Sequence, residues 1–168
     1  MNGTDVLIDG LDRVRGGVHR LVDGLDPDEL TYQPRPGANT IGWQVWHLTR
    51  GTDAQVAHLD DTSQLWTTGG FAERLGFDPD PNDTGYGQTP EEAAAVRIDQ
   101  MDLMLGYLDE VIARSVARLQ RLSDEDLDRV VDRNWQPPVT EGVRWVSIIG
   151  DCLQHIGQAN YVKGMLVG

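Results

Sequence analysis

Hydrophobic residues recur every three or four positions near the start of the chain. The series consists of Val6, Leu7, Leu11, Val14, Val18, Leu21, Val22 and Leu25. Side chains at this spacing share one stripe of an amphipathic helix. The pattern therefore predicts a first helix over about residues 4–24, with this stripe facing a core.

A second helix is predicted over residues 41–59, again from apolar residues at helical spacing. Residues 26–30 form a short acidic turn before it, and residues 33–37 are extended because each proline disfavours helix in the residue preceding it. Asn39 or Thr40 supplies the N-cap of the second helix. Its apolar and aromatic residues lie on two adjoining faces, and we expect both faces to be partly buried.

The segment 60–88 is rich in Gly, Pro, Asp and Thr, which predicts a long loop with at most a helical turn at residues 71–75. Loops longer than about 12–15 residues are usually functional or disordered. Aromatic residues argue against disorder in this one, and it carries Trp66, Phe71, Phe77 and Tyr86. The loop is therefore a candidate substrate lid.

A capping box opens the third helix, since Thr89 is followed by Pro90 and, three residues after the cap, by Glu92. Apolar residues at near-heptad spacing then predict one continuous helix to about Arg121. The remaining elements are a short acidic helix over residues 124–131 capped by Ser123, a loop at residues 134–138, and a final helix over about residues 143–166.

No segment shows a parallel-sheet pattern, so the predicted fold class is all-α. Four long helices with a long loop between the second and the third predict an up-and-down four-helix bundle. The length of 168 residues suits a single domain over residues 1–168.

Composition narrows the classes of partner. The chain carries 27 Asp and Glu against 14 Lys and Arg, a formal net charge of -13. Such a charge repels phosphate backbones and anionic lipids, so we expect no nucleic acid and no membrane partner. No apolar run is long enough to span a bilayer, and the N-terminus lacks a secretion-signal pattern, which predicts a cytoplasmic protein. The single cysteine, Cys152, excludes an internal disulfide and a cysteine-based zinc knuckle.

Two segments resemble each other within the chain. Residues 41–48 and 149–156 share an Ile-Gly start and a histidine at the seventh position, and each follows a Leu-acidic-Leu turn and a proline-bearing loop. If the two halves are related helix pairs, His47 and His155 face each other across the bundle. Chance and generic bundle patterning explain so short a similarity equally well.

Helical geometry selects one candidate metal site. Asp151 and His155 are four residues apart and therefore neighbours on one helix face. His47 and His58 lie about 16 Å apart along their helix and cannot bind one ion together. The sensible set is His47, Asp151 and His155, an open site of the catalytic type.

Other interpretations of these residues stay open. An Asp–His pair at this spacing is common by chance, and His47 beside two tryptophans could equally be a core histidine bonded to the backbone. His19 and His58 are assigned to partly solvated faces. Cys152 points about 100° away from Asp151 around the helix, and we interpret it as a small buried hydrophobe rather than a nucleophile.

Three motifs together resemble the DinB-like superfamily. They are Pro-x-Pro-Gly-x-Asn-Thr-Ile-Gly-Trp-x-x-Trp-His-Leu at residues 34–48, Gly-Tyr-Gly at residues 85–87, and His-Ile-Gly-Gln at residues 155–158. The chain looks most like the branch with mycothiol and bacillithiol S-transferases and the metal-binding half of mycothiol-dependent maleylpyruvate isomerase. The resemblance spans nearly the whole chain.

The resemblance implies a four-helix bundle holding a divalent ion through three histidines, one from the second helix and two from the fourth. His47 and His155 match the first and last of these, and Asp151 stands where the family has the middle histidine. A carboxylate oxygen also binds Zn, Ni or Fe, so metal binding is compatible with the change. The change could also mark a member that has lost metal and activity.

The resemblance further implies a metal-dependent thiol S-transferase. The ion would lower the pKa of a small thiol of the mycothiol type, which then adds to an electrophile. Arg50, Trp66 and Tyr86 are the expected substrate contacts, although Arg50 could equally be a surface ion-pair partner and Tyr86 a loop anchor. Gln158 is expected to orient a metal ligand through a hydrogen bond, and no catalytic side chain is identified. A homodimer is also expected.

Two alternatives come from other functional classes. The same ion could activate water in a metal-dependent hydrolase, or the chain could be a catalytically silent dimeric bundle that serves as an interaction module. Activity that requires a thiol would separate the transferase from the hydrolase. A lack of stoichiometric metal would favour the interaction module.

Overall fold

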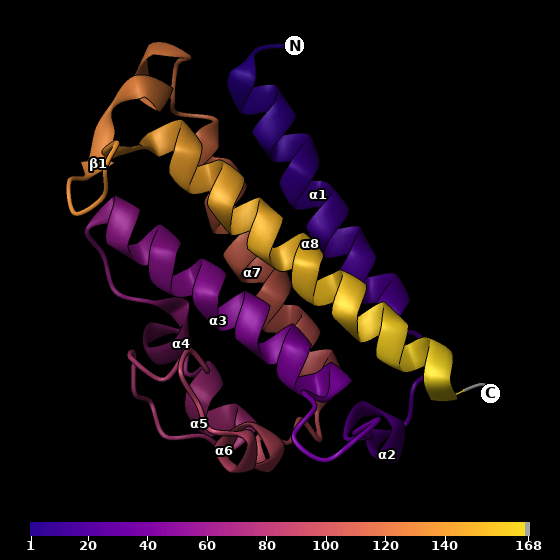
Figure 1. The fold of residues 1–168 in the computed structure, drawn as a ribbon. Coiled ribbons are helices and arrows are strands. Elements are labelled where there is room, and N and C mark those ends of the chain that lie inside the picture. Colours follow the sequence, from indigo (N-terminus) through magenta and orange to yellow (C-terminus); the bar gives the residue numbers. More distant parts are fainter. Residues whose placement is uncertain (167–168) are drawn as a thin grey trace.

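Four long helices form a bundle in the computed structural model, which describes residues 1–166 (Figure 1). They are α1 (Gly3–Val22), α3 (Ile41–Asp60), α7 (Met101–Leu119) and α8 (Glu141–Leu166). The short helices are α2 (Pro27–Leu30), α4 (Leu65–Thr68), α5 (Phe71–Leu75) and α6 (Pro90–Ala95). The predicted all-α fold class is confirmed. None of the helices in the described part of the chain has the length and hydrophobicity that crossing a membrane requires.

Local capping defines the helix starts. Thr40, rather than Asn39, caps α3, and its side chain accepts a hydrogen bond from the backbone N–H of Trp43. The capping box of Thr89 and Glu92 forms as predicted at the start of α6. These bonds satisfy backbone donors that the first helical turn leaves without a partner.

The predicted apolar stripe of α1 is buried except at its first and last members, and the last, Leu25, follows the helix and is partly buried. Leu11, Val14 and Val18 are fully buried, whereas Val6 is 55% exposed. The stripe that faces the core runs through Leu7, and Val6 is one residue away from it, turned by about 100°. The inclusion of Val6 in the core-facing stripe was therefore wrong.

Glycines allow α1 to approach α8 closely. A Cβ added at Gly10 would lie 3.0 Å from Cδ1 of Ile149, and one added at Gly17 would lie 3.3 Å from Cδ1 of Ile156. Both distances are shorter than ordinary van der Waals contact, so the isoleucines of α8 pack directly against the backbone of α1. This contact fixes the orientation of α8, the helix that carries Asp151 and His155.

The predicted helix from residue 90 to Arg121 is broken. α6 ends at Ala95, Val96 has an extended backbone, and α7 begins at Met101. Val96 and Ile98 are buried, and Ile98 packs beside Gly42 at the start of α3. Burial of these two side chains outweighs continuation of the helix, although the spacing of Ile98 to Met101 fits a helical seam.

The acidic segment after Ser123 is also different from the prediction. A single 3-10 turn, η1 (Glu125–Asp128), replaces the expected helix, and it is followed by a small hairpin of β1 (Val130–Asp132) and β2 (Val139–Thr140). The two strands are antiparallel, with Val130 opposite Thr140. An ion pair between Arg129 and Glu141 joins this segment to the start of α8, so tertiary contacts hold it extended.

The long segment between α3 and α6 folds against the bundle. α5 forms at the residues where a helical turn was predicted, and α4 is an additional turn that the sequence did not predict. Trp66 and Phe71 from these turns are buried in the core. The segment gathers beside α3 (Figure 1), so it adds a wall to the helix that carries His47.

Candidate metal centre

α3 and α8 bring the three predicted ligands together. His47 lies on α3, Asp151 and His155 lie on α8, and one ligand atom from each falls within 4.8 Å of the other two. The His155 Nε2 atom is 3.5 Å from Oδ1 of Asp151. The rings of His47 and His155 meet edge to face, with centroids 4.5 Å apart. The facing arrangement predicted from the internal similarity is confirmed, while a duplication origin stays a hypothesis.

A backbone carbonyl orients the ring of His47. The carbonyl oxygen of Thr84 lies 2.5 Å from Nδ1 of His47. A carbonyl can only accept, so Nδ1 carries the proton and the lone pair of Nε2 is free for a metal ion. Trp43 stacks on the same ring at a centroid distance of 4.5 Å and restricts its rotation.

A side-chain amide orients His155 in the same way. Oε1 of Gln44 lies 2.5 Å from Nδ1 of His155, and Nε2 of Gln44 donates to Oε1 of Gln158 at 3.0 Å. His155 therefore also presents an unprotonated Nε2. Gln158 lies two hydrogen bonds behind the ligand, and its expected supporting role stays a prediction. Sequence reasoning missed Gln44, although it lies on α3 one turn before His47.

The electrostatics suit a cation. Burial lowers the pKa of His47, and the neighbouring His155 lowers it further, against the opposing effect of the bond to Thr84. The adjacent imidazole of His155, and more weakly that of His47, holds the pKa of Asp151 below its ordinary value. A neutral imidazole and an ionised carboxylate are the forms that bind divalent metals. Two imidazole nitrogens and a carboxylate oxygen also leave coordination positions open.

Gly85 allows the loop to reach His47. Its φ is +84°, and an added Cβ would lie 2.9 Å from Nδ1 of His47 and 2.8 Å from the ring of Trp46. Only glycine fits this combination of positive φ and close approach. The Gly-Tyr-Gly motif was visible in the sequence, but its role against His47 was not.

Two cavities flank the cluster. One of about 340 Å³ is lined by Trp43, His47 and Tyr86, and a second of about 570 Å³ is lined by Gln44, Gln158 and Tyr161. Both reach Gly37 and Asn39. Tyr86 is 92% exposed at the edge of the first cavity, and its contact with a substrate stays a prediction.

Arg50 and Trp66 require a correction. Both side chains are completely buried, and the guanidinium of Arg50 lies 4.6 Å from the centroid of the Trp66 ring. The long segment after α3 covers them, so they belong to the core and line neither cavity beside the cluster. The expected substrate contacts at these two residues are therefore wrong.

Cys152 is a buried hydrophobe, as interpreted from the sequence. Its side chain is buried, and this burial raises the pKa of the thiol to about 12. Of the other histidines, His19 contacts Asp109 at 2.9 Å and His58 is exposed, so neither joins the cluster. Trp145 is a core residue that donates to Glu141, and Trp135 is exposed in its loop.

Comparisons with known proteins identify relatives of the whole chain. The model of the DinB superfamily matches residues 10–159. The crystal structure of a conserved protein from Enterococcus faecalis is similar over 100% of this chain and 99% of that one, with 32% identity and a TM-score of 0.91. No curated protein matches the chain.

Proposed function

The chain belongs to the DinB superfamily, and from this premise we propose that it binds one divalent ion through His47, Asp151 and His155 and transfers a small thiol to an electrophile. The observation that carries the proposal is the convergence of three donor atoms within 4.8 Å of one another, two of them on imidazoles whose other nitrogen is already hydrogen-bonded. Zn, Ni and Fe suit this mixed nitrogen and oxygen donor set.

The chain's own residues prepare the site before a ligand arrives. Thr84 and Gln44 each hold one imidazole in the form that presents Nε2, so binding requires no change of tautomer. Such partners behind the ligands orient them and raise their basicity. The bound ion supplies Lewis-acid chemistry, which lowers the pKa of a thiol or water placed beside it.

A small-molecule thiol is proposed because the chain offers none of its own. Cys152 is the single cysteine, and its buried thiol has a pKa raised to about 12. A thiolate at neutral pH must therefore come from a co-substrate, for which the mycothiol type is our proposal. The cavity of about 340 Å³ that His47 lines gives such a molecule access to the site.

Elemental analysis after loading with excess Zn, Ni or Fe and dialysis tests the metal site. We expect about one equivalent in the wild type and none in Asp151→Ala or His155→Ala. His19→Ala removes a histidine that pairs with Asp109 outside the cluster, so this control should retain the metal. Wild-type protein that retains no metal would overturn the proposal and favour a catalytically silent interaction module.

Assays with the loaded protein then separate two reaction classes. An electrophile consumed only when thiol is present supports the transferase. Equal consumption without thiol indicates that the site activates water, and the protein is then a metal-dependent hydrolase.

We also propose a homodimer, as expected from the sequence. Apart from Asp151, whose side chain is 49% exposed, the exposed residues of α8 are uncharged. They are Val143, Val146, Ser147, Leu153, Gln154, Gly157, Gln158, Asn160, Tyr161, Gly164 and Met165. Two copies that each carry a formal charge of -13 repel one another, and a surface with few charges is where they can meet at the lowest electrostatic cost. The cytoplasmic location stays a prediction from the sequence.

A further inference from the structure

We propose that Arg50 is a positioning residue for the metal centre: it holds the loop at residues 80–83 so that the next carbonyl, that of Thr84, fixes His47. The inference rests on the proposed function for its effect on metal affinity. Its effect on the ring of His47 is independent of any metal. Arg50, which the sequence analysis expected to contact a substrate, would thus hold a loop of the protein itself.

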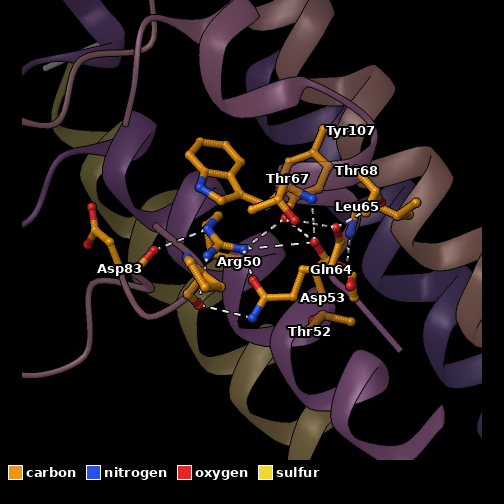
Figure 2. A network of polar contacts seen from close by, with 12 residues as sticks. Arg50, Thr52, Asp53, Gln64, Leu65, Thr67, Thr68, Asp83 and Tyr107 are labelled. Atoms are coloured by element: carbon orange, nitrogen blue, oxygen red, sulfur yellow. Dashed lines mark hydrogen bonds and ion pairs between the residues drawn. The ribbon is translucent and has the colours of Figure 1, made fainter. Parts of the chain in front are cut away.

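The guanidinium of Arg50 donates to three carbonyls of the loop backbone. Its Nε donates to the carbonyl of Asp83 at 3.1 Å, and its Nη2 donates to the carbonyls of Pro81 at 3.3 Å and Asp80 at 3.4 Å. Figure 2 shows Arg50 between Asp83 on one side and Asp53 on the other. A planar fork of donors can serve several carbonyls at once, which one ammonium group cannot do in the same geometry.

The other side of the guanidinium is anchored in the core. Nη1 donates to Gln64 at 2.8 Å and to the hydroxyl of Tyr107 at 3.2 Å, and it lies 3.8 Å from the carboxylate of Asp53. Asp53 in turn accepts from Tyr107 and from the backbone of α4. A buried charge is tolerated only with such full pairing, and the pairing leaves Arg50 little freedom to move.

The loop depends on these contacts because its own backbone supplies little order. Between residues 80 and 88 the described backbone bonds are Thr84 N–H to Asn82 and Gln88 N–H to Gly85. Gln64 adds one more tether by donating to the carbonyl of Pro81 at 3.0 Å. Asp83 also accepts from Gln88, which in turn accepts from Trp43. The contacts of Arg50 end at Asp83, and the following carbonyl, that of Thr84, accepts from His47.

The loop connects two residues of the same helix, α3. His47 and Arg50 are one turn apart on this helix, and the loop bridges them through the carbonyls of Thr84 and Asp83. Arg50 does not touch the ligand positions, so it acts through the loop. Releasing the loop would remove the acceptor that keeps the proton on Nδ1 of His47.

Arg50→Lys tests the inference with Arg118→Lys as the matched control. Lysine keeps a positive charge beside Asp53 but cannot reproduce the fork that spans the loop carbonyls and the core. Arg118 is also a buried arginine, and it pairs with Glu141 and Asp60 at the other end of α3. Both variants should lower the melting temperature, and only Arg50→Lys should disturb His47.

Two measurements report the effect of each variant on His47. Nitrogen-15 NMR of the metal-free protein reports the tautomer of His47, and competition with a chelator reports the affinity for Zn²⁺. In Arg50→Lys we expect a mixture of tautomers at His47 and an affinity about 10- to 100-fold weaker than in the wild type. Arg118→Lys should keep the wild-type tautomer and affinity.

The outcomes separate the inference from the proposed function. A wild-type protein that binds no Zn²⁺ overturns the proposed function, while the NMR comparison still decides the role of Arg50. If Arg50→Lys loses melting temperature as Arg118→Lys does but keeps the tautomer of His47, Arg50 is only structural and the inference is overturned.

Discussion

Gln44 on α3 lies 2.5 Å from Nδ1 of His155 on α8, so one helix orients a candidate ligand that the other helix carries. The amide also joins Gln158, which lies one turn beyond His155. Gln44 is buried, and its amide is therefore held by these two partners rather than by water. The same arrangement makes the α3–α8 contact part of the candidate metal centre.

Replacing Gln44 should weaken metal binding more than it weakens the fold. Gln44→Leu removes the acceptor of His155, and we expect Zn²⁺ affinity to fall about 10- to 100-fold in a chelator competition. Gln55→Leu is the control on the same helix, because Gln55 contacts Arg144 instead of the cluster. Equal affinities in the two variants would contradict the orienting role of Gln44.

Gly85→Ala should displace the loop from His47. The positive φ and the contact of the new Cβ with Nδ1 predict a loss of about 1–3 kcal/mol in the free energy of unfolding and weaker Zn²⁺ binding. Gly87→Ala is the matched control, since Gly87 has a similar φ of +78° but open space around its Cβ position. Chemical denaturation and metal titration measure the two effects. A Gly87→Ala variant that binds as weakly would assign the loss to backbone strain alone.

Glu141 should make the free energy of unfolding depend on pH. Burial raises the pKa of its carboxyl group, but hydrogen bonds from Arg118 and Arg129 outweigh this and lower it below the ordinary value of 4.5. A lowered folded-state pKa means that the stabilisation is present above about pH 4.5 and is lost as the pH falls through the folded-state pKa.

The Glu141→Gln variant provides the measurement. It should lose about 3 kcal/mol of unfolding free energy at pH 7, because the buried Arg118 keeps its charge while the carboxylate that pairs with it is replaced by a neutral amide. Urea titrations between pH 7 and pH 3 should show the difference from the wild type shrinking with acid. A difference that stays constant over this range would contradict the pKa argument.

Charge on the exposed face of α8 should separate the two copies. Leu153→Glu places a carboxylate in the uncharged set, and sedimentation velocity should then show a monomer where the wild type sediments as a dimer. Val6→Glu adds the same charge to the exposed face of α1 and should leave the dimer intact. A monomeric wild type would refute the homodimer directly.

Much of the helical framework could be predicted because its causes are local. The apolar stripe of α1 and the caps at Thr40 and Thr89 depend on residues within one or two turns of each other. The DinB resemblance is confirmed by the match over residues 10–159. The break after Ala95 could not be predicted, because Ile98 keeps helical spacing to Met101 while the burial of Val96 and Ile98 depends on a different part of the chain.

Polar residues inside the fold were the harder case. Arg50 carries a charge, and a charged residue in a sequence is usually interpreted as a surface residue or a substrate contact. The segment that covers it, with Gln64 and Asp83, is what buries Arg50 and supplies its hydrogen-bond acceptors. Gln44 stands at an unspecified position of the motif at residues 34–48, and its role exists only where α3 meets α8.

The sequence by itself determined that Asp151 and His155 share one face of a helix, since a spacing of four residues brings side chains together in any helix. Only the tertiary structure decided that His47 joins them and that Thr84 and Gln44 fix both imidazoles. Periodicity constrains neighbours within one element, whereas distances between α3, α8 and the loop follow from packing over the whole chain.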